Sequence, residues 1–182
     1  MVKRGAVRTK ILTTVMTIIV IIFCAIIYLT VNKGEDISDT AAINFSSKML
    51  RQGEVEVALS ILNKKIKAGT DNPLIFYNAG VVLLNKREYS KAVELFSESI
   101  RLDPSVSALN NRAFCYTTLN ESKKAIDDYT AILEIDENQA ASYLRRGQLY
   151  FNIGDFKSAK VDLEKASSLG LKEAKKLLKK ME

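Results

Sequence analysis

The chain has 182 residues, of which 47% are hydrophobic and 26% are charged, with a formal net charge of +6. This length accommodates one ordinary domain with an attachment, and this composition excludes a chain that is disordered throughout. Histidine is absent, which removes the commonest general base and transition-metal ligand, and without a phosphate-binding glycine loop or zinc-type cysteine cluster we expect no enzyme activity, catalytic residue, cofactor or metal site.

Residues 1–10 form a basic flank that carries Lys3, Arg4, Arg8 and Lys10. The end of the chain, residues 171–182, is also basic, with five lysines against two glutamates. The two ends therefore carry more than the whole net charge, and the body between them is near neutral. A near-neutral body argues against a nucleic-acid-binding surface, so we expect no nucleic acid partner.

Residues 11–31, from Ile11 to Val31, form an apolar run without a charge. A helix of this length spans roughly 30 Å, at about 1.5 Å per residue, which matches the thickness of a bilayer core. Tyr28 lies near the second boundary, where aromatic rings favour the membrane interface. A domain of this size could not cover a helix that is apolar on every face, so we predict a transmembrane helix.

A cleaved signal peptide is the main alternative, because the run is N-terminal and follows a basic start. The run is longer than a typical signal core, and no pair of small residues marks a cleavage site behind it. Phe23 stands before Cys24, where a lipoprotein signal has a small residue. We therefore expect an uncleaved anchor, and we expect Cys24 and Cys115 to pack as small apolar residues rather than to pair.

The flanks of the anchor predict its orientation. Four basic residues precede it, whereas Lys33 follows it beside Glu35, Asp36 and Asp39. The positive-inside rule then keeps the N-terminus in the cytoplasm and sends the rest of the chain across the membrane. We expect a single-pass protein whose domain is extracytoplasmic, or periplasmic in a bacterium. In a mitochondrial outer membrane the same layout could face the cytosol.

A linker, 32–38, leads to residues 39–72, which carry a degenerate version of a pattern that recurs further along the chain. In this segment Gly53 marks a turn, and Ala58 and Leu62 precede Ala92 and Phe96 by one and the same interval. Terminal repeats of a stack are usually atypical. We therefore predict a degenerate helix pair over 39–72.

The clear repeats are three units of nearly equal length, at 73–105, 106–139 and 140–170. Each unit has two short helical patterns around a polar turn. Each also has a small residue in the first helix, then an alanine and a large apolar residue in the second: Gly80, Ala92 and Phe96; Ala113, Ala125 and Tyr129; Gly147, Ala159 and Leu163. Small residues let helices approach closely. Because a helix pair cannot bury its apolar face alone, neighbouring units must stack.

This pattern resembles the tetratricopeptide repeat family. The third unit matches it best, and Leu102-Asp103-Pro104 is a typical closing phrase of the first. The second unit departs from it, with Ile132 for the late alanine and Glu137 for the proline. The resemblance implies an all-α fold: after the N-terminal transmembrane helix, a right-handed superhelix of helix pairs, closed by a capping helix over 171–182. Attraction of that lysine-rich helix to anionic lipid is the alternative reading of its charge.

In the resembled family the first helices of the repeats line a concave groove that holds a peptide or a partner helix. Here these helices are expected near 74–86, 106–119 and 140–153. The residues that the resemblance places in the groove are Tyr77, Asn78, Asn111, Phe114, Arg145 and Gln148. Some family members hold the acidic tail of a chaperone. Asn111 and Arg145 fill places of that kind, but Tyr77, Val81 and Ala141 fill the others, so we do not expect that ligand.

These observations lead to a membrane-anchored scaffold or assembly factor that holds a client protein or peptide in its groove. The alternative is a receptor or chaperone-like accessory for protein translocation or import, which would bind passing peptides transiently. An enzyme whose site leaves no pattern is the third class. The identity of the partner, the organism and the oligomeric state stay open at this point.

Overall fold

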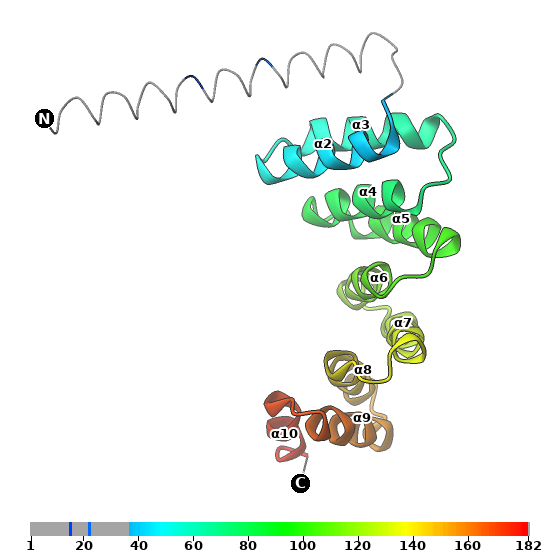
Figure 1. The fold of residues 1–182 in the computed structure, drawn as a ribbon. Coiled ribbons are helices and arrows are strands. Elements are labelled where there is room, and N and C mark those ends of the chain that lie inside the picture. The colour runs from blue at the N-terminus through cyan, green and yellow to red at the C-terminus, as the bar shows by residue number, and fades with distance from the viewer. Residues whose placement is uncertain (1–14, 16–21, 23–36, 182) are drawn as a thin grey trace, which may run out of the picture. The chain divides into compact units, whose positions relative to one another are not determined.

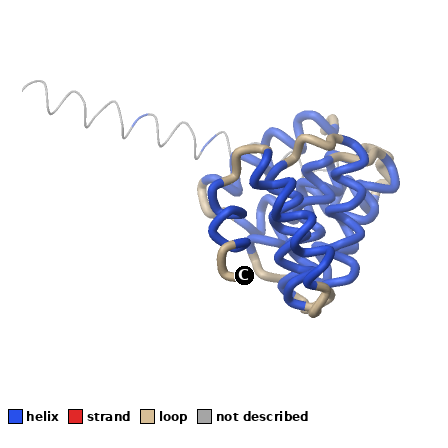
Figure 2. The backbone as a smooth tube through the Cα atoms, turned by 90° about the horizontal axis from the view of Figure 1, so that it is seen from below, coloured by secondary structure: helices blue, strands red, loops and turns tan. Residues whose placement is uncertain are grey.

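The computed structural model describes Val15, Ile22 and residues 37–181 (Figure 1). Residues 37–181 form consecutive helices joined by short loops, and this part of the chain contains no strand (Figure 2). The helices are α2 (Asp39–Arg51), α3 (Val55–Lys67), α4 (Pro73–Asn85), α5 (Tyr89–Leu102), α6 (Val106–Thr118), α7 (Ser122–Ile135), α8 (Ala140–Asn152), α9 (Phe156–Ser168) and α10 (Lys172–Leu178).

The turns inside the helix pairs share one backbone conformation. A residue with φ between 61° and 84° follows α2, α4, α6 and α8, and these residues are Gly53, Arg87, Asn120 and Gly154. After each of them a backbone N–H bonds the carbonyl five residues earlier, for example Glu88 N to Leu83 O at 2.9 Å and Asp155 N to Tyr150 O at 2.9 Å. This closure satisfies carbonyls at the helix end and turns the chain sharply. The second helix therefore folds back on the first.

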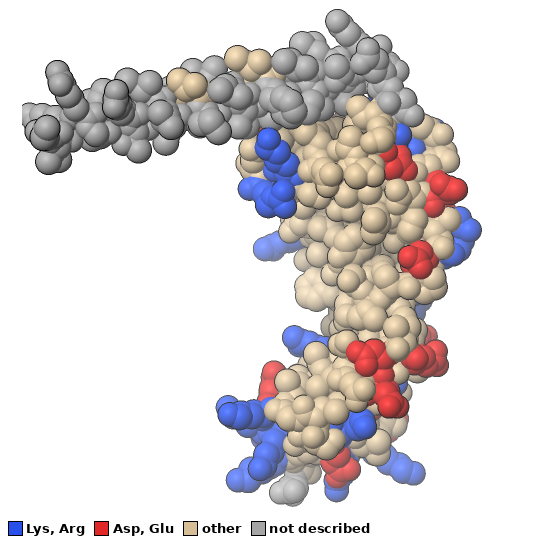
Figure 3. All heavy atoms as spheres, in the orientation of Figure 1, with Lys and Arg blue, Asp and Glu red and all other residues tan. Residues whose placement is uncertain are grey.

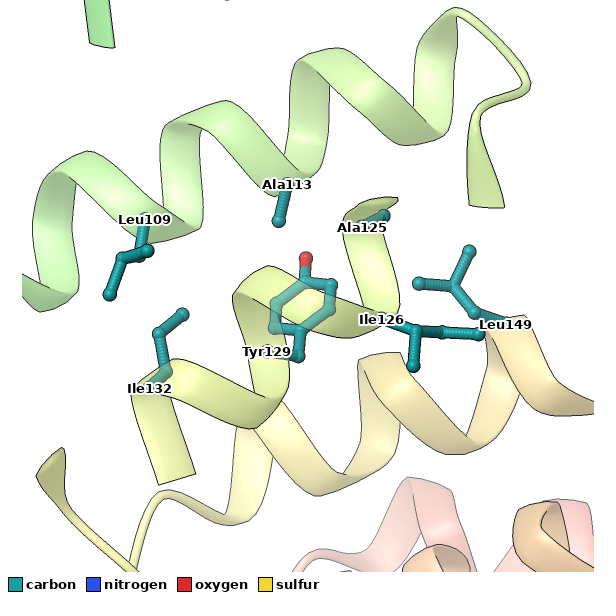
Figure 4. Packing of buried hydrophobic residues seen from close by; sticks show 7 residues of the cluster. All are labelled: Leu109, Ala113, Ala125, Ile126, Tyr129, Ile132 and Leu149. Atoms are coloured by element: carbon teal, nitrogen blue, oxygen red, sulfur yellow. The ribbon is translucent and has the colours of Figure 1, made fainter. Parts of the chain in front are cut away.

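Contact between the helices of a pair depends on the small residue in the first helix. In the second unit Ala113 faces Tyr129, and both belong to a buried cluster with Leu109, Ala125 and Ile132 (Figure 4). This cluster also includes Leu149 of α8, so it joins the second unit to the third. The apolar face of each pair is thus completed by the next pair, as stacked repeats require.

The last helix, α10, covers the end of the stack. Ala174 is fully buried, and it belongs to a cluster with Leu144, Leu163 and Ala166 of the third unit. Half-buried Leu177 and Met181 pack against the same cluster. A helical cap therefore stands within the segment 171–182, over Lys172–Leu178.

The segment predicted to cross a membrane, Ile11–Val31, lies outside the described residues except for Val15 and Ile22, which are helical and exposed. The basic flank 1–10 and most of the linker 32–38 lie outside them as well. No helix in the part of the chain that the structure describes is long and apolar enough to cross a membrane.

Candidate partner-binding surface

The first helices of the three clear units, α4, α6 and α8, lie on one side of the helical stack Ala42–Glu182 (Figure 1). None of these helices contains an aspartate or a glutamate. Their charged residues are Arg112, Arg145 and Arg146, and only Arg145 is exposed. Negative charge is instead carried by second helices such as α5 and α7. The surface of the first helices is therefore neutral to basic.

Two of the predicted groove residues contact each other across adjacent repeats. The side-chain amide of Asn111 in α6 donates a hydrogen bond to the hydroxyl of Tyr77 in α4 at 3.3 Å. The ring of Tyr77 lies against buried Phe96, with ring centroids 6.0 Å apart. Both Tyr77 and Asn111 are half-buried. This pair joins the first two units and presents a polar edge on the first-helix side.

Asn78 hydrogen-bonds two other residues of the chain. Its amide nitrogen donates to the carbonyl of Leu74 one turn earlier, at 2.7 Å. Its amide oxygen accepts a hydrogen bond from the hydroxyl of Ser47 in α2, at 3.4 Å. Donor and acceptor thus both have partners within the chain, one of them on the preceding helix pair. The contact that the structure assigns to Asn78 is between helices.

The remaining predicted residues form two separate groups. Phe114 is 52% exposed, and its ring meets Tyr89 edge-on at 6.4 Å between centroids. In α8, Arg145 donates a hydrogen bond to the side-chain oxygen of Gln148 at 3.4 Å. Arg145 is exposed and Gln148 half-buried. The structure thus brings together Tyr77 with Asn111, and Arg145 with Gln148, while Asn78 and Phe114 pair with residues that were not predicted.

Two buried ion pairs on the same helices were missed by sequence reasoning. Arg112 donates to both carboxylate oxygens of Asp128 at 3.0 and 2.6 Å, and also to the hydroxyl of Ser97 at 2.9 Å. Arg146 repeats this arrangement one unit later, with Asp162 and Thr130. Each arginine thus joins three consecutive helices. The sequence does contain a signal for these ion pairs. Arg112 and Arg146 are separated by one repeat unit, and Asp128 and Asp162 are separated by the same interval.

Burial and ion pairing shift the pKa values of these groups in opposite directions. Burial raises the pKa of the Asp128 carboxyl group, while the hydrogen bonds from Arg112 lower it. The hydrogen bonds to Asp162 raise the pKa of the Arg146 guanidinium above its already high ordinary value. In each pair both carboxylate oxygens accept hydrogen bonds from one guanidinium, which is the geometry of a strong bidentate contact. These pairs hold the repeats in register and leave Arg145 as the exposed cation of the first helices α4, α6 and α8.

Comparison with known proteins places the repeats in a family. The tetratricopeptide repeat family matches residues 74–105, 106–139 and 140–169, which together are more than half of the chain. The chain is 34% identical over 88 residues to the DnaJ homolog subfamily C member 7 homolog of Dictyostelium discoideum, a match that covers 46% of this chain and 16% of that protein.

A second relative and a solved structure agree with this match. The chain is 32% identical over 103 residues to the tetratricopeptide repeat protein 36 homolog of Drosophila melanogaster, covering 54% of this chain and 56% of that protein. The crystal structure of YrrB, described as a tetratricopeptide repeat protein with an unusual peptide-binding site, shares its fold with a TM-score of 0.65 at 21% identity. That likeness covers 71% of this chain and 67% of YrrB. The chain belongs to the tetratricopeptide repeat family.

Proposed function

We propose that this chain is a membrane-anchored scaffold or assembly factor that holds a protein or peptide partner on the surface of α4, α6 and α8. The observation that carries this proposal is the character of that surface. It has no acidic residue, it exposes Arg145 and Phe114, and it presents the polar pair of Tyr77 and Asn111. An aromatic ring, a cation and amide groups on one rigid face suit recognition of a polypeptide.

Anchoring is supported by the uncharged run of residues 11–31 behind a basic flank. A tether to the membrane raises the effective concentration of the surface for membrane partners, so that modest contacts suffice for binding. The charges on the two sides of the run favour a cytoplasmic N-terminus and an extracytoplasmic repeat domain.

Crosslinking in membranes tests the binding role. We expect gentle crosslinking followed by purification of the full chain from detergent extract to recover a discrete partner. Arg145→Glu should reduce this recovery strongly, because it reverses the exposed charge of the surface. Lys160→Glu is the matched control, since Lys160 is also exposed but lies on the second helix α9. Equal recovery with both variants, or no partner at all, would contradict the proposal.

Protease accessibility tests the proposed orientation separately. In intact spheroplasts or vesicles of defined sidedness, an added protease should digest the repeats only from the extracytoplasmic side. Digestion only from the cytoplasmic side would overturn the orientation, and release of the chain by an alkaline wash would overturn the anchor.

A further inference from the structure

A cavity of about 390 Å³ opens between α8, α9 and the end of the chain. Its apolar lining comes from Phe151 in α8, Leu163 in α9, Leu177 in α10 and Met181. Its polar lining is Gln148, Asn152 and Lys180. This volume falls within the range of roughly 300 to 1,000 Å³ that is common for ligand pockets. The capping helix therefore builds a wall as well as covering the last repeat.

The cavity adjoins the proposed binding surface. Gln148 lines it and also accepts the hydrogen bond from exposed Arg145 at 3.4 Å. Phe151 and Asn152 belong to α8, the first helix of the third unit. Leu163 is 1% exposed and forms part of the buried cluster beneath α10. The cavity thus adjoins the surface of the first helices, and the apolar side chain of Leu163 lines its buried end.

Phe151 remains accessible although it lines this cavity. Its side chain is 45% exposed, and its ring meets that of Phe156 edge-on, at 5.2 Å between centroids. An accessible aromatic ring beside a buried leucine is a suitable surface for an apolar side chain of a partner.

The one charged residue that lines the cavity is basic. None of its lining residues is acidic, and Lys180 is exposed at its edge. Arg145 is exposed and donates a hydrogen bond to Gln148 of the lining. Several Lys and Arg side chains lie at this C-terminal end of the stack, with some Asp and Glu side chains among them (Figure 3). The complementary partner carries negative charge close to its apolar side chain.

We infer that this cavity binds a partner segment in which a bulky apolar side chain is followed by carboxylates. The apolar side chain enters between Phe151 and Leu177, and a carboxylate of the segment pairs with Lys180 or Arg145. This inference rests on the proposed binding role, and it adds which chemistry is recognised and where. It also gives the capping helix a part in recognition.

A short fluorescein-labelled peptide with a phenylalanine followed by glutamates, in a Gly-Ser background, is the probe. Binding to the full chain in mild detergent is followed by fluorescence anisotropy. Replacing the peptide phenylalanine by alanine should weaken binding about ten-fold or more, because burial of an aromatic side chain is lost. Phe151→Ala should weaken it by a similar factor, and Lys180→Glu by about five-fold with a strong dependence on salt.

Two control variants separate the cavity from its surroundings. Lys179→Glu makes the same charge change at the adjacent exposed residue, which does not line the cavity. Val161→Ala shortens an exposed apolar side chain on α9 that does not line the cavity. Both should leave the affinity of the peptide within about two-fold, as expected for surface changes outside a contact. Circular dichroism of every variant checks that the helices are intact.

Three outcomes would overturn the inference: no binding of the peptide, equal binding of the alanine peptide, or an unchanged affinity in Phe151→Ala. The proposed function can fail independently. If no partner is recovered in membranes while the peptide binds as described, binding at the cavity is supported and the scaffold role is contradicted. If partner recovery depends on Arg145 and Phe114 but not on Phe151 and Lys180, the scaffold role is supported and the cavity is not the binding site for the partner segment.

Discussion

The three clear repeats solve the same packing problem in two ways at the residue scale. In the second and third units, an arginine of the first helix pairs with a buried aspartate of the second. In the first unit the equivalent positions hold Ala79 and Leu95, which are apolar. A buried ion pair repays its desolvation only while both partners are present, whereas an apolar pair has no such cost. The chain therefore contains its own apolar reference for the ion pairs.

We predict that Arg146→Ala lowers the free energy of unfolding by about 3 kcal/mol, because it leaves Asp162 buried without its partner. The side chain of Asp162 is 4% exposed, so it depends on Arg146 rather than on solvent for its hydrogen bonds. The double variant Arg146→Ala/Asp162→Leu copies the first unit and should recover most of this loss. Urea denaturation followed by circular dichroism measures both. A double variant no more stable than Arg146→Ala would refute this account of the pair.

A second residue-scale prediction concerns Cys115, which is fully buried. Burial raises the pKa of its thiol to about 11. At pH 8 the thiol is thus protonated, and the thiolate is the reactive form. In a Cys24→Ser background, a thiol reagent should react with the native chain very slowly and with the urea-unfolded chain at the rate of an ordinary cysteine. Fast labelling of the native chain at pH 8 would contradict this prediction.

Individual groove contacts were harder to predict than the helices that carry them. Asn78, which the resemblance placed in the groove, hydrogen-bonds Leu74 and Ser47, and neither contact was foreseen. An asparagine has several polar atoms, and neighbouring helices compete with a ligand for them. The sequence shows which helix an asparagine occupies, but it does not show which of those partners it meets. For the same reason the hydrogen bond between Tyr77 and Asn111 was not foreseen.

At the scale of elements, the sequence was more informative. The first helices expected near 74–86, 106–119 and 140–153 are observed as α4, α6 and α8, over 73–85, 106–118 and 140–152. Apolar periodicity and small residues at fixed spacing determine such helices locally. The turn residues Arg87 and Asn120 were not recognised as left-handed, because non-glycine residues rarely adopt a positive φ. The cavity beside α10 depends on side-chain packing at the end of the stack and left no local signal.

Close approach of paired helices can be tested at their small residues. A Cβ atom at Gly80 would lie 2.7 Å from a ring carbon of Phe96, which is fully buried. Carbon atoms prefer about 3.5 to 4.0 Å. The usual cost of overpacking is about 1 to 3 kcal/mol, and the higher helix propensity of alanine offsets about 1 kcal/mol of it. We therefore predict that Gly80→Ala destabilises the chain by up to about 2 kcal/mol.

Gly147→Ala is the matched comparison for Gly80→Ala. Its added Cβ would lie 3.1 Å from Leu163, so the clash is smaller. Replacing glycine by alanine inside a helix also contributes about 1 kcal/mol of helix propensity, and we expect Gly147→Ala to be close to neutral. Thermal unfolding of the two variants measures the difference. If Gly147→Ala were the more damaging change, the spacing between helices would not control packing in the way described.

At the scale of the whole molecule, stability is distributed along the stack. The helices of the described region contact their neighbours in the chain, as α4 with α5, α5 with α6, and so on to α9 with α10. Within residues 37–181, the helices farther apart have few contacts. Repeat arrays of this kind behave as a sum of units and nearest-neighbour interfaces. A local change should therefore destabilise its own end of the stack first.

We predict that Ala174→Asp opens the C-terminal end without opening the first clear unit. The new carboxylate would lie in the buried cluster of Leu144, Leu163 and Ala166, at a cost of roughly 2 kcal/mol or more. Hydrogen exchange followed by mass spectrometry should show faster exchange in α8, α9 and α10, and unchanged exchange in α4 and α5. Lys175→Asp introduces the same side chain at the next, exposed residue and should leave all these helices protected. Equal acceleration along the whole stack would instead mean that the repeats unfold as one cooperative unit.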